Sequence, residues 1–504
     1  MPRMGFAIDN RSCIGCHACT VACKSEHSVP IGVNRTWVKY VEQGTFPDTK
    51  RSFSVQRCNH CDDAPCVEIC PVTSLYRRPD GIVDFDSDRC IGCTACMQAC
   101  PYDAIYLDPA TLTAAKCNYC THRVDAGYEP ACVIVCPVEA IVCGDLDDPD
   151  SKIAKLQRTQ QVHFPKVEKR TEPKLFYVGG ETANYDPTSA PPAEQYLWSA
   201  GQAAAALDLI APDPAHETGA GARRVYDAKA KPTTWGWMVS AYITTKAIAT
   251  GTAMMACLLF AAGRHPSVLP RSAAAISLVF LAVTGALLVG DLKQPRRFLY
   301  ILLRPQWKSW LVRGAYLISA FGLVLGVCAF APIETWRRPI QSTVGAVLFV
   351  LAASTASYTA LLFAQAKGRD YWQNRLFVIT MFVDALVAGA AVLTLVGAIG
   401  IDGGMAATDA RMVLGIAVTV LAALLIAEFA PSHATKDAAL AARLILHERY
   451  RYWFWGGVVS VGILVPAVCV VIGVALEGAA MGLIVGIAAK NHVFVQAPQR
   501  IPLS

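Results

Sequence analysis

The chain has 504 residues, of which 54% are hydrophobic and only 17% charged, and its formal net charge is +6. One soluble domain of this length would hold fewer apolar residues, and their excess lies after residue 235, so we predict a soluble part followed by a membrane part. The modest positive charge forms no basic stripe with interleaved aromatic residues, which excludes a nucleic-acid-binding protein.

The residues before the first cysteine, MPRMGFAIDNRS, hold no apolar run and no pair of arginines. We therefore expect neither a secretory signal nor a twin-arginine signal. Cysteine-rich segments usually form disulfides in exported proteins and bind metals in cytoplasmic ones. The expected lack of a signal thus favours metal binding by the cysteines of this chain.

Sixteen of the 20 cysteines lie between residues 13 and 136, in four groups of four. The groups are Cys13/Cys16/Cys19/Cys23, Cys58/Cys61/Cys66/Cys70, Cys90/Cys93/Cys96/Cys100 and Cys117/Cys120/Cys132/Cys136. Three cysteines at intervals of three residues, then a fourth before a proline, are typical of [4Fe–4S] ferredoxins, in which the fourth cysteine binds the other cluster of a pair. The first and third groups have this spacing, the second and fourth have longer gaps, and only Cys23 lacks the proline.

Zinc sites, disulfides and buried thiols are the alternatives for these sixteen residues. Zinc sites usually consist of two CxxC pairs without a third cysteine and a CxxxCP ending, so the spacing favours iron–sulfur clusters. The sequence from Cys13 to His17 also fits haem c attachment, but the ferredoxin pattern uses both of its thiols. Cross-ligation predicts two clusters, one on Cys58, Cys61, Cys66 and Cys100 and one on Cys90, Cys93, Cys96 and Cys70. Four cysteines fall outside the pattern, of which Cys257, Cys328 and Cys469 lie in apolar segments and Cys143 does not.

Residues 6–157 resemble the four-cluster electron-transfer subunit of membrane-bound molybdopterin oxidoreductases, such as the dimethyl sulfoxide, polysulfide, thiosulfate and formate enzymes, and all sixteen cysteines match. The resemblance implies an α+β ferredoxin-like domain over residues 1–157 with four [4Fe–4S] clusters in a nearly linear series. It also implies a third cluster on Cys13, Cys16, Cys19 and Cys136 and a fourth on Cys117, Cys120, Cys132 and Cys23. The implied partner is a separate molybdopterin subunit, with molybdenum or tungsten on a bis-pyranopterin, that performs the substrate chemistry.

Residues 158–234 are rich in alanine and proline and are predicted to form an extended connector, with one strand in PKLFYVGG at 173–180. The connector holds neither a GxGxxG nor a Walker A sequence. Its GAGAR sequence lacks the preceding strand and following helix of a phosphate-binding loop. We therefore predict no nucleotide cofactor.

After Pro232 come about eight apolar segments that are long enough to cross a bilayer as helices. They are placed at 236–262, 273–290, 314–332, 342–363, 376–400, 412–430, 453–474 and 476–494. Tryptophans near their ends, including Trp235, Trp307, Trp372 and Trp453, fit the aromatic belt at a membrane surface. The sequence thus predicts an all-α polytopic membrane domain over residues 235–504.

The stretches GDLKQPRRFLYILLRPQWKSWLVRGAY at 290–316 and HVFVQAPQRIPLS at 492–504 make this second half resemble the NrfD or polysulfide reductase membrane-subunit family. The resemblance implies eight helices, a quinone (menaquinone or ubiquinone) and no haem, with the quinone near the start of the first helix on the cluster side. The residues also argue against haem b, which needs paired histidines inside helices. The four histidines of this half, His265, His433, His447 and His492, lie in predicted loops or at helix ends.

Ionisable residues at membrane depth are costly and therefore mark functional sites. Lys246, Asp384 and Glu428 lie inside predicted helices, and the two acidic residues, with Asp291, are candidates for proton transfer. The predicted quinone site comprises Trp237, Tyr242, Lys246, Asp291 and Arg297. The alternative for its first three residues is an interfacial anchor with a snorkelling lysine.

Loops on the predicted N-terminal side of the membrane carry thirteen Lys and Arg residues, and the opposite loops carry five. Positively charged loops stay in the cytoplasm, so we predict a multi-pass inner-membrane protein with a cytoplasmic iron–sulfur domain. A periplasmic location, reached by export with a catalytic partner, is the alternative.

Together these patterns predict an electron-transfer and quinone-reacting membrane anchor of a multisubunit oxidoreductase, in contact with membrane lipid and the quinone pool. We find no candidate catalytic residue for a substrate in the chain itself. One alternative is a passive anchor, or an ion-translocating module, whose clusters serve only a soluble redox partner. Another is a module of a larger respiratory complex with cytochrome c subunits, as in alternative complex III.

Overall fold

The computed structural model describes residues 2–45, 47–190, 222–228, 231–401 and 403–504. The chain divides into two compact units. The first comprises Met1–Pro232 with Ala366–Gly368 and Pro502–Ser504, and the second comprises Thr233–Gln365 and Arg369–Ile501. The first unit is a small α+β structure and the second is helical, so the predicted fold class is confirmed.

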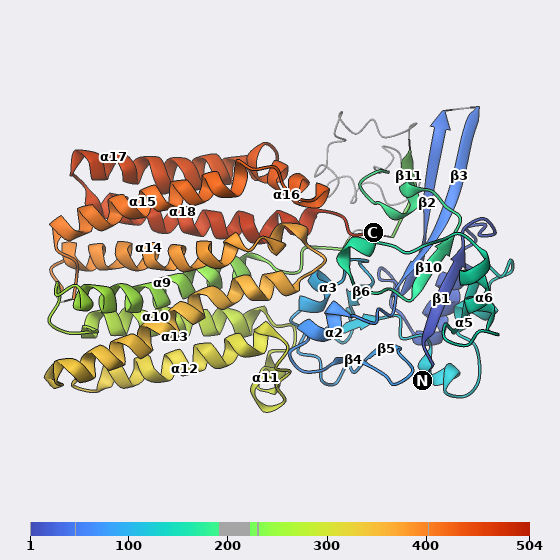
Figure 1. Ribbon diagram of the computed structural model, residues 1–504, viewed down its shortest axis with the longest axis horizontal. Coiled ribbons are helices and arrows are strands. Elements are labelled where there is room, and N and C mark those ends of the chain that lie inside the picture. Colours follow the sequence, from blue (N-terminus) through green and yellow to red (C-terminus); the bar gives the residue numbers. More distant parts are fainter. Residues whose placement is uncertain (1, 46, 191–221, 229–230, 402) are drawn as a thin grey trace. The chain divides into compact units, whose positions relative to one another are not determined.

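The first unit contains a four-stranded sheet with the strand order β8–β1–β10–β9; its strands β1 and β10 are labelled in Figure 1. Its strands are β8 (Ile141–Asp145), β1 (Met4–Asp9), β10 (Leu175–Val178) and β9 (Val162–His163). β1 runs parallel to β10 and antiparallel to β8, and apolar side chains of all three strands pack with Ile153 of α6 (Lys152–Thr159). The strand expected at 173–180 is β10. Because β9 and β10 belong to this sheet, part of the expected connector lies within the first unit.

A second sheet has the strand order β11–β2–β3. A long hairpin of β2 (Thr36–Thr45) and β3 (Asp48–Arg57) is joined by β11 (Arg223–Tyr226). The Ala- and Pro-rich residues 191–221 of the predicted connector, including most of GAGAR, lie outside the described residues.

The second and third cysteine groups have the same local fold. Each has a short helix between its second and fourth cysteines, α2 (Pro65–Ile69) or α3 (Ala95–Ala99), and the two helices pack together. A two-stranded hairpin then follows, β4 (Leu75–Arg77) with β5 (Val83–Phe85), or β6 (Ile105–Leu107) with β7 (Ala114–Lys116). The repeated cysteine groups of the sequence therefore correspond here to a repeated structural unit.

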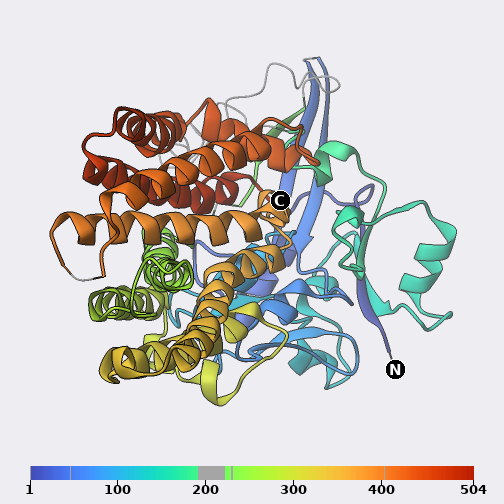
Figure 2. The same ribbon diagram turned by 60° about the vertical axis from the view of Figure 1, so that its left-hand side comes forward.

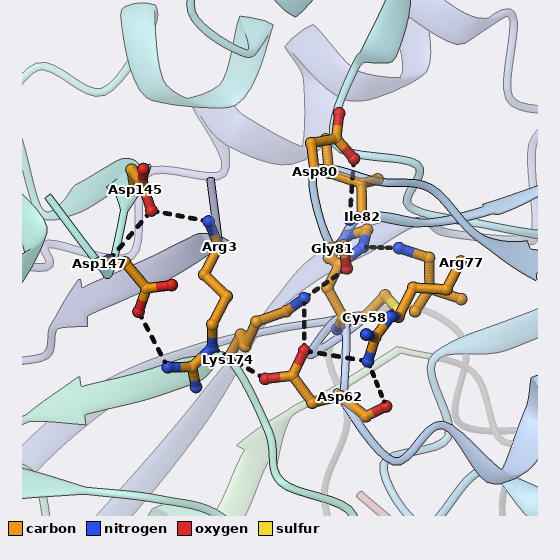
Figure 3. A network of polar contacts seen from close by, with 12 residues as sticks. Arg3, Cys58, Asp62, Arg77, Asp80, Gly81, Ile82, Asp145, Asp147 and Lys174 are labelled. Atoms are coloured by element: carbon orange, nitrogen blue, oxygen red, sulfur yellow. Dashed lines mark hydrogen bonds and ion pairs between the residues drawn. The ribbon is translucent and has the colours of Figure 1, made fainter. Parts of the chain in front are cut away.

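A buried lysine fixes the loop of the second cysteine group to the first sheet (Figure 3). Lys174, which precedes β10 and has a fully buried side chain, lies 3.1 Å from Asp62 Oδ1 and donates a hydrogen bond to the carbonyl of Gly81. Asp62 directly follows Cys61 and also pairs with Arg3 at 2.9 Å and with Arg77 at 3.4 Å. These contacts hold the cysteine loop in place from several sides.

In the second unit, eight described helices are long and apolar enough to span a membrane, which confirms the predicted number. The spans are α9 (Trp237–Ala261), α10 (Arg271–Asp291), α12 (Trp310–Phe330), α13 (Arg338–Gln365), α14 (Leu376–Ala398), α15 (Ala407–Phe429), the π-helical η5 (Trp453–Leu464) continued by α17 (Val465–Ile472), and α18 (Leu476–Gln496). The long helices run side by side as a bundle (Figure 1 and Figure 2). α9 packs against α10, α13, α14 and α18, and outer helices expose apolar side chains such as Phe330 and Val471. Such apolar faces suit a lipid environment.

Two features of this unit differ from the expectations. A helix α16 (Lys436–Leu446) lies in the predicted loop between the sixth and seventh spans. Trp235 and Trp372 are buried and stack at 5.4 Å, and Trp372 Nε1 donates to the carbonyl of Phe494 at 2.9 Å. These two tryptophans therefore pack inside the unit, whereas Trp307 and Trp453 are exposed as an aromatic belt requires.

Helices α9 and α14 meet backbone to backbone at Gly251 and Gly389. A Cβ atom at Gly251 would overlap the carbonyl of Ala385 and lie 2.9 Å from the amide nitrogen of Gly389. We expect Gly251→Ala to destabilise the second unit by at least about 2 kcal/mol, because the helices must separate. Thermal unfolding in detergent measures this change. Gly326→Ala in α12, where a Cβ would meet nothing within 4 Å, is the control and should leave the melting temperature unchanged or slightly raised.

Candidate iron–sulfur and quinone sites

The four CxxC segments share one backbone feature. The residue before the second cysteine has a positive φ in all four: 70° at Gly15, 46° at His60, 69° at Gly92 and 65° at Tyr119. Glycine adopts this conformation freely, whereas histidine and tyrosine adopt it at some cost. The same turn therefore forms in each group, although only two of the four sequences place glycine there.

This turn directs a backbone N–H toward the first cysteine of each group. His60 N lies 3.5 Å from Cys58 Sγ and Gly92 N lies 3.4 Å from Cys90 Sγ, and the amides of Gly15 and Tyr119 act in the same way on Cys13 and Cys117. The fourth cysteines also accept from backbone amides, as in the 3.2 Å bond from Ala140 N to Cys136 Sγ. Hydrogen bonds to sulfur stabilise thiolate ligands and help to set the potential of a bound cluster.

The thiols of each predicted cluster set lie within electrostatic reach of one another. The sets are Cys13/Cys16/Cys19/Cys136, Cys58/Cys61/Cys66/Cys100, Cys70/Cys90/Cys93/Cys96 and Cys23/Cys117/Cys120/Cys132. Among the described residues, no three His, Cys, Asp or Glu side chains converge as they would around a single metal ion.

Twelve of the sixteen cysteines are buried; Cys13, Cys93 and Cys136 are half-buried, and Cys16 is exposed. The first set is thus the one nearest to solvent.

The buried thiols are difficult to ionise. Burial, together with the neighbouring Cys58, raises the pKa of Cys100 to about 11, although the amides of Ala104 and Tyr102 act in the opposite direction. Burial also raises the pKa of Cys19 to about 11. Such thiols stay protonated at neutral pH unless a metal replaces the proton, so cluster insertion must release protons here.

Buried basic residues surround the cysteines, and their role is not evident from the sequence. Arg57 is only 1% exposed and its Nη1 donates to Cys132 Sγ at 3.1 Å. Lys116 is fully buried and donates at 2.8 Å to the carbonyl of Cys117. Four thiolates outweigh the positive charge of a [4Fe–4S] core, so a bound cluster is anionic and needs such cations nearby. The donor set, its amide hydrogen bonds and these cations all fit iron–sulfur clusters.

The predicted quinone residues are brought together only in part. Lys246 is fully buried in α9, donates to the carbonyl of Ala356 at 3.1 Å and to the Thr359 hydroxyl, and lies 4.4 Å from the centre of the Tyr358 ring. Tyr242, one turn earlier, is within electrostatic reach of Tyr358 and of Asp291 at the end of α10. Trp237, at the start of α9, is 62% exposed, and Arg297 ends the short helix η2 (Pro295–Arg297).

A mostly apolar cavity in the second unit, lined by residues of α14, α15 and α18 among others, contains three acidic or basic side chains. Lys490 of α18 forms an ion pair with Asp384 of α14, with Nζ–O distances of 2.9 and 3.1 Å, and both residues line the cavity. Glu428 of α15 lines it as well and accepts a hydrogen bond from the Tyr371 hydroxyl. None of the five predicted quinone residues is part of this lining. The sequence analysis identified Asp384 and Glu428 as membrane-embedded acids but did not identify Lys490 as a partner.

Fold and cysteine geometry define an iron–sulfur unit joined to a multi-pass membrane unit. The family model described as "Polysulphide reductase, NrfD" matches residues 226–497, which is more than half of the chain, and the model described as "4Fe-4S dicluster domain" matches residues 49–146. The chain therefore belongs to the polysulphide reductase NrfD family, and it carries a 4Fe–4S dicluster domain on the same polypeptide. Both resemblances noted in the sequence are thereby confirmed.

Curated relatives match over a length close to that of the iron–sulfur unit. A tetrathionate reductase subunit of Salmonella typhimurium is 42% identical over 200 residues, which are 39% of this chain and 80% of the relative. A polysulfide reductase chain of Wolinella succinogenes is 44% identical over 179 residues, 35% of this chain and 94% of the relative. A putative dimethyl sulfoxide reductase iron-sulfur subunit of Halobacterium salinarum is 37% identical over 213 residues, 36% of this chain and 80% of the relative.

Proposed function

We propose that this chain relays electrons between a separate catalytic subunit and the quinone pool through four [4Fe–4S] clusters. The observation that supports this most strongly is the fourfold repetition of one turn, with an amide directed at the first cysteine of each group. Clusters bound in this way pass single electrons between fixed positions. The task of the chain is then to hold the sixteen thiolates and to supply hydrogen bonds and positive charge around them.

The proposed ligand sets are the four that cross-ligation and the family resemblance predict. Each set combines three cysteines of one group with the fourth cysteine of another, and the electrostatic neighbours of the thiols support this assignment. The set of Cys13, Cys16, Cys19 and Cys136 contains the one exposed cysteine of the sixteen. We therefore propose it as the point where electrons enter from, or leave to, the catalytic subunit.

The proposed partner is a molybdopterin subunit. The relatives named above are subunits of tetrathionate, polysulfide and dimethyl sulfoxide reductases, and they support a catalytic partner of this kind. For the location, we propose the inner membrane, with the iron–sulfur unit in the cytoplasm, because the loop charges favour that orientation. Export together with the catalytic partner would place the same unit in the periplasm.

The proposed quinone site is the start of α9, with Tyr242 and Lys246 as polar groups toward the head group and Asp291 nearby. Reduction of a quinone needs two protons as well as two electrons, and we propose that the acids Asp384 and Glu428 take part in that supply. A decisive experiment reduces the clusters in the purified protein and follows their reoxidation by an added quinone. Reoxidation by the quinone that a quinone-site inhibitor blocks supports the proposal. Reoxidation at a rate that depends on neither the quinone nor the inhibitor favours a passive anchor.

Lys246→Leu is expected to slow quinol turnover at least tenfold without changing the iron content. The substitution removes the only charged side chain of α9 and its bonds to Ala356 and Thr359, which position the ammonium group. Steady-state quinol oxidation and iron analysis of the same samples measure the two quantities. Lys436→Leu, which changes an exposed lysine at the start of α16, is the control. Normal turnover in Lys246→Leu would remove this lysine from the site.

A further inference from the structure

Arg57, the last residue of β3, carries a positive charge in the interior of the iron–sulfur unit. Its guanidinium lies 4.7 Å from the centre of the Phe6 ring, and its Nη1 donates to Cys132 Sγ at 3.1 Å. Its Nε and Nη2 atoms have no hydrogen-bond partner within the described part of the chain. No carboxylate is among the groups that act most strongly on its charge. Among the described residues, Arg57 is thus a buried cation without a carboxylate partner.

A buried charge costs several kcal/mol unless an opposite charge compensates it. The Arg57 guanidinium donates a hydrogen bond to Cys132 Sγ at 3.1 Å, and the sulfurs of Cys117 and Cys19 are the other groups that interact most strongly with its charge. When a cluster replaces the thiol protons, these three sulfurs become the anionic groups within electrostatic reach of the guanidinium. The counterion of Arg57 is therefore the cysteine array itself.

The three sulfurs come from two different predicted cluster sets. Cys117 and Cys132 belong to the set with Cys23 and Cys120, whereas Cys19 belongs to the set with Cys13, Cys16 and Cys136. Arg57 consequently lies at the junction of two neighbouring sets. A cation in that position attracts the charge of both clusters and reduces the repulsion between them.

We propose that Arg57 is an electrostatic link between these two clusters and raises the reduction potential of both. The inference rests on the ligand sets of the proposed function. Each reduction adds one electron, and so one negative charge, to an already anionic cluster. The buried guanidinium stabilises the added charge, because little solvent is present to screen it. Arg57 acts here through the ligands as a positioning and tuning residue, and it binds no iron itself.

The test compares Arg57→Gln and Arg57→Lys with the unmodified full-length protein in detergent, using dithionite titration and EPR to obtain the midpoint potential of each cluster. Arg57→Gln should lower the reduction equilibrium constant of two clusters at least tenfold, or about 59 mV for one electron, and leave the other two unchanged. Arg57→Lys keeps the charge, so its potentials should shift by no more than half of the shift seen in Arg57→Gln. Arg89→Gln is the matched control, because Arg89 also directly precedes the first cysteine of a group but is exposed. Solvent screens its charge, so no potential should shift.

The iron content and the midpoint potentials of the two Arg57 variants together test the inference. Full iron with unchanged potentials in Arg57→Gln, or equal shifts of all four clusters, would overturn the inference. If Arg57→Gln fails to retain iron while Arg57→Lys retains iron and normal potentials, the need for the charge is supported. Loss of iron in both variants would mean that the shape of the arginine matters, and would contradict the inference. Failure of the proposed function would instead be visible in the unmodified protein, as missing iron.

Discussion

Cys96→Ala is expected to remove or convert one iron–sulfur cluster and to leave the other three in place. Cys96 is buried in α3 and lies within electrostatic reach of Cys93, Cys90 and Cys70. A cubane with only three thiolates loses an iron or fails to assemble, because each iron needs its own protein ligand. Iron should therefore fall by about one atom for a converted cluster and by about four for a lost one.

EPR of the reduced protein, together with iron analysis, measures this loss. Cys143→Ala is the matched control, because Cys143 lies in the same unit, on β8, but outside the sixteen-cysteine pattern. It should retain the complete spectrum and the full iron content. An unchanged spectrum in Cys96→Ala would contradict the ligand sets, and so would equal losses in the two variants.

The second large effect is expected at the ion pair of Asp384 and Lys490. The Asp384 side chain is 4% exposed and that of Lys490 is 14% exposed, in a cavity among membrane-spanning helices. Removal of one partner leaves the other charge buried without compensation, which typically costs about 3–5 kcal/mol. We therefore expect Asp384→Asn and Lys490→Met each to destabilise the second unit strongly.

A double-mutant cycle separates the charge effect from other consequences of substitution. Unfolding of the detergent-solubilised protein should show that the variant with both Asp384→Asn and Lys490→Met regains much of the stability lost in either single variant. The exposed Lys436→Met on α16 should change little. Losses that simply add in the double variant would show that the two residues do not stabilise each other.

The cysteine groups and the helical spans are visible in the sequence because their signals are local. The four cysteines of one group are close together in the chain, so their spacing is visible in the sequence, as in Cys90 to Cys100. Membrane spans are recognisable from the length of an apolar run, and all eight were found, although α13 extends to Arg338 and Gln365 beyond the predicted 342–363. Strand β10 was also expected, but its pairing with β1 was not.

The features that the sequence did not reveal depend on contacts between distant residues. Asp384 and Lys490 are 106 positions apart, and Arg57 reaches Cys132 across 75 positions. Lys490 and Arg57 each have an ordinary explanation on their own, as a snorkelling lysine and an exposed arginine. Trp235 and Trp372 likewise resembled surface anchors until their mutual stacking placed them in the interior. Only the fold shows which buried charges compensate each other.

The most direct test of the account is the metal content of the purified full-length protein. Iron, acid-labile sulfide and zinc are measured in one sample, together with the number of free thiols after denaturation. Four cubanes predict about sixteen irons and as many sulfides per chain, without stoichiometric zinc and without disulfides among the sixteen cysteines. Stoichiometric zinc with little iron, or cysteines paired as disulfides, would contradict the account.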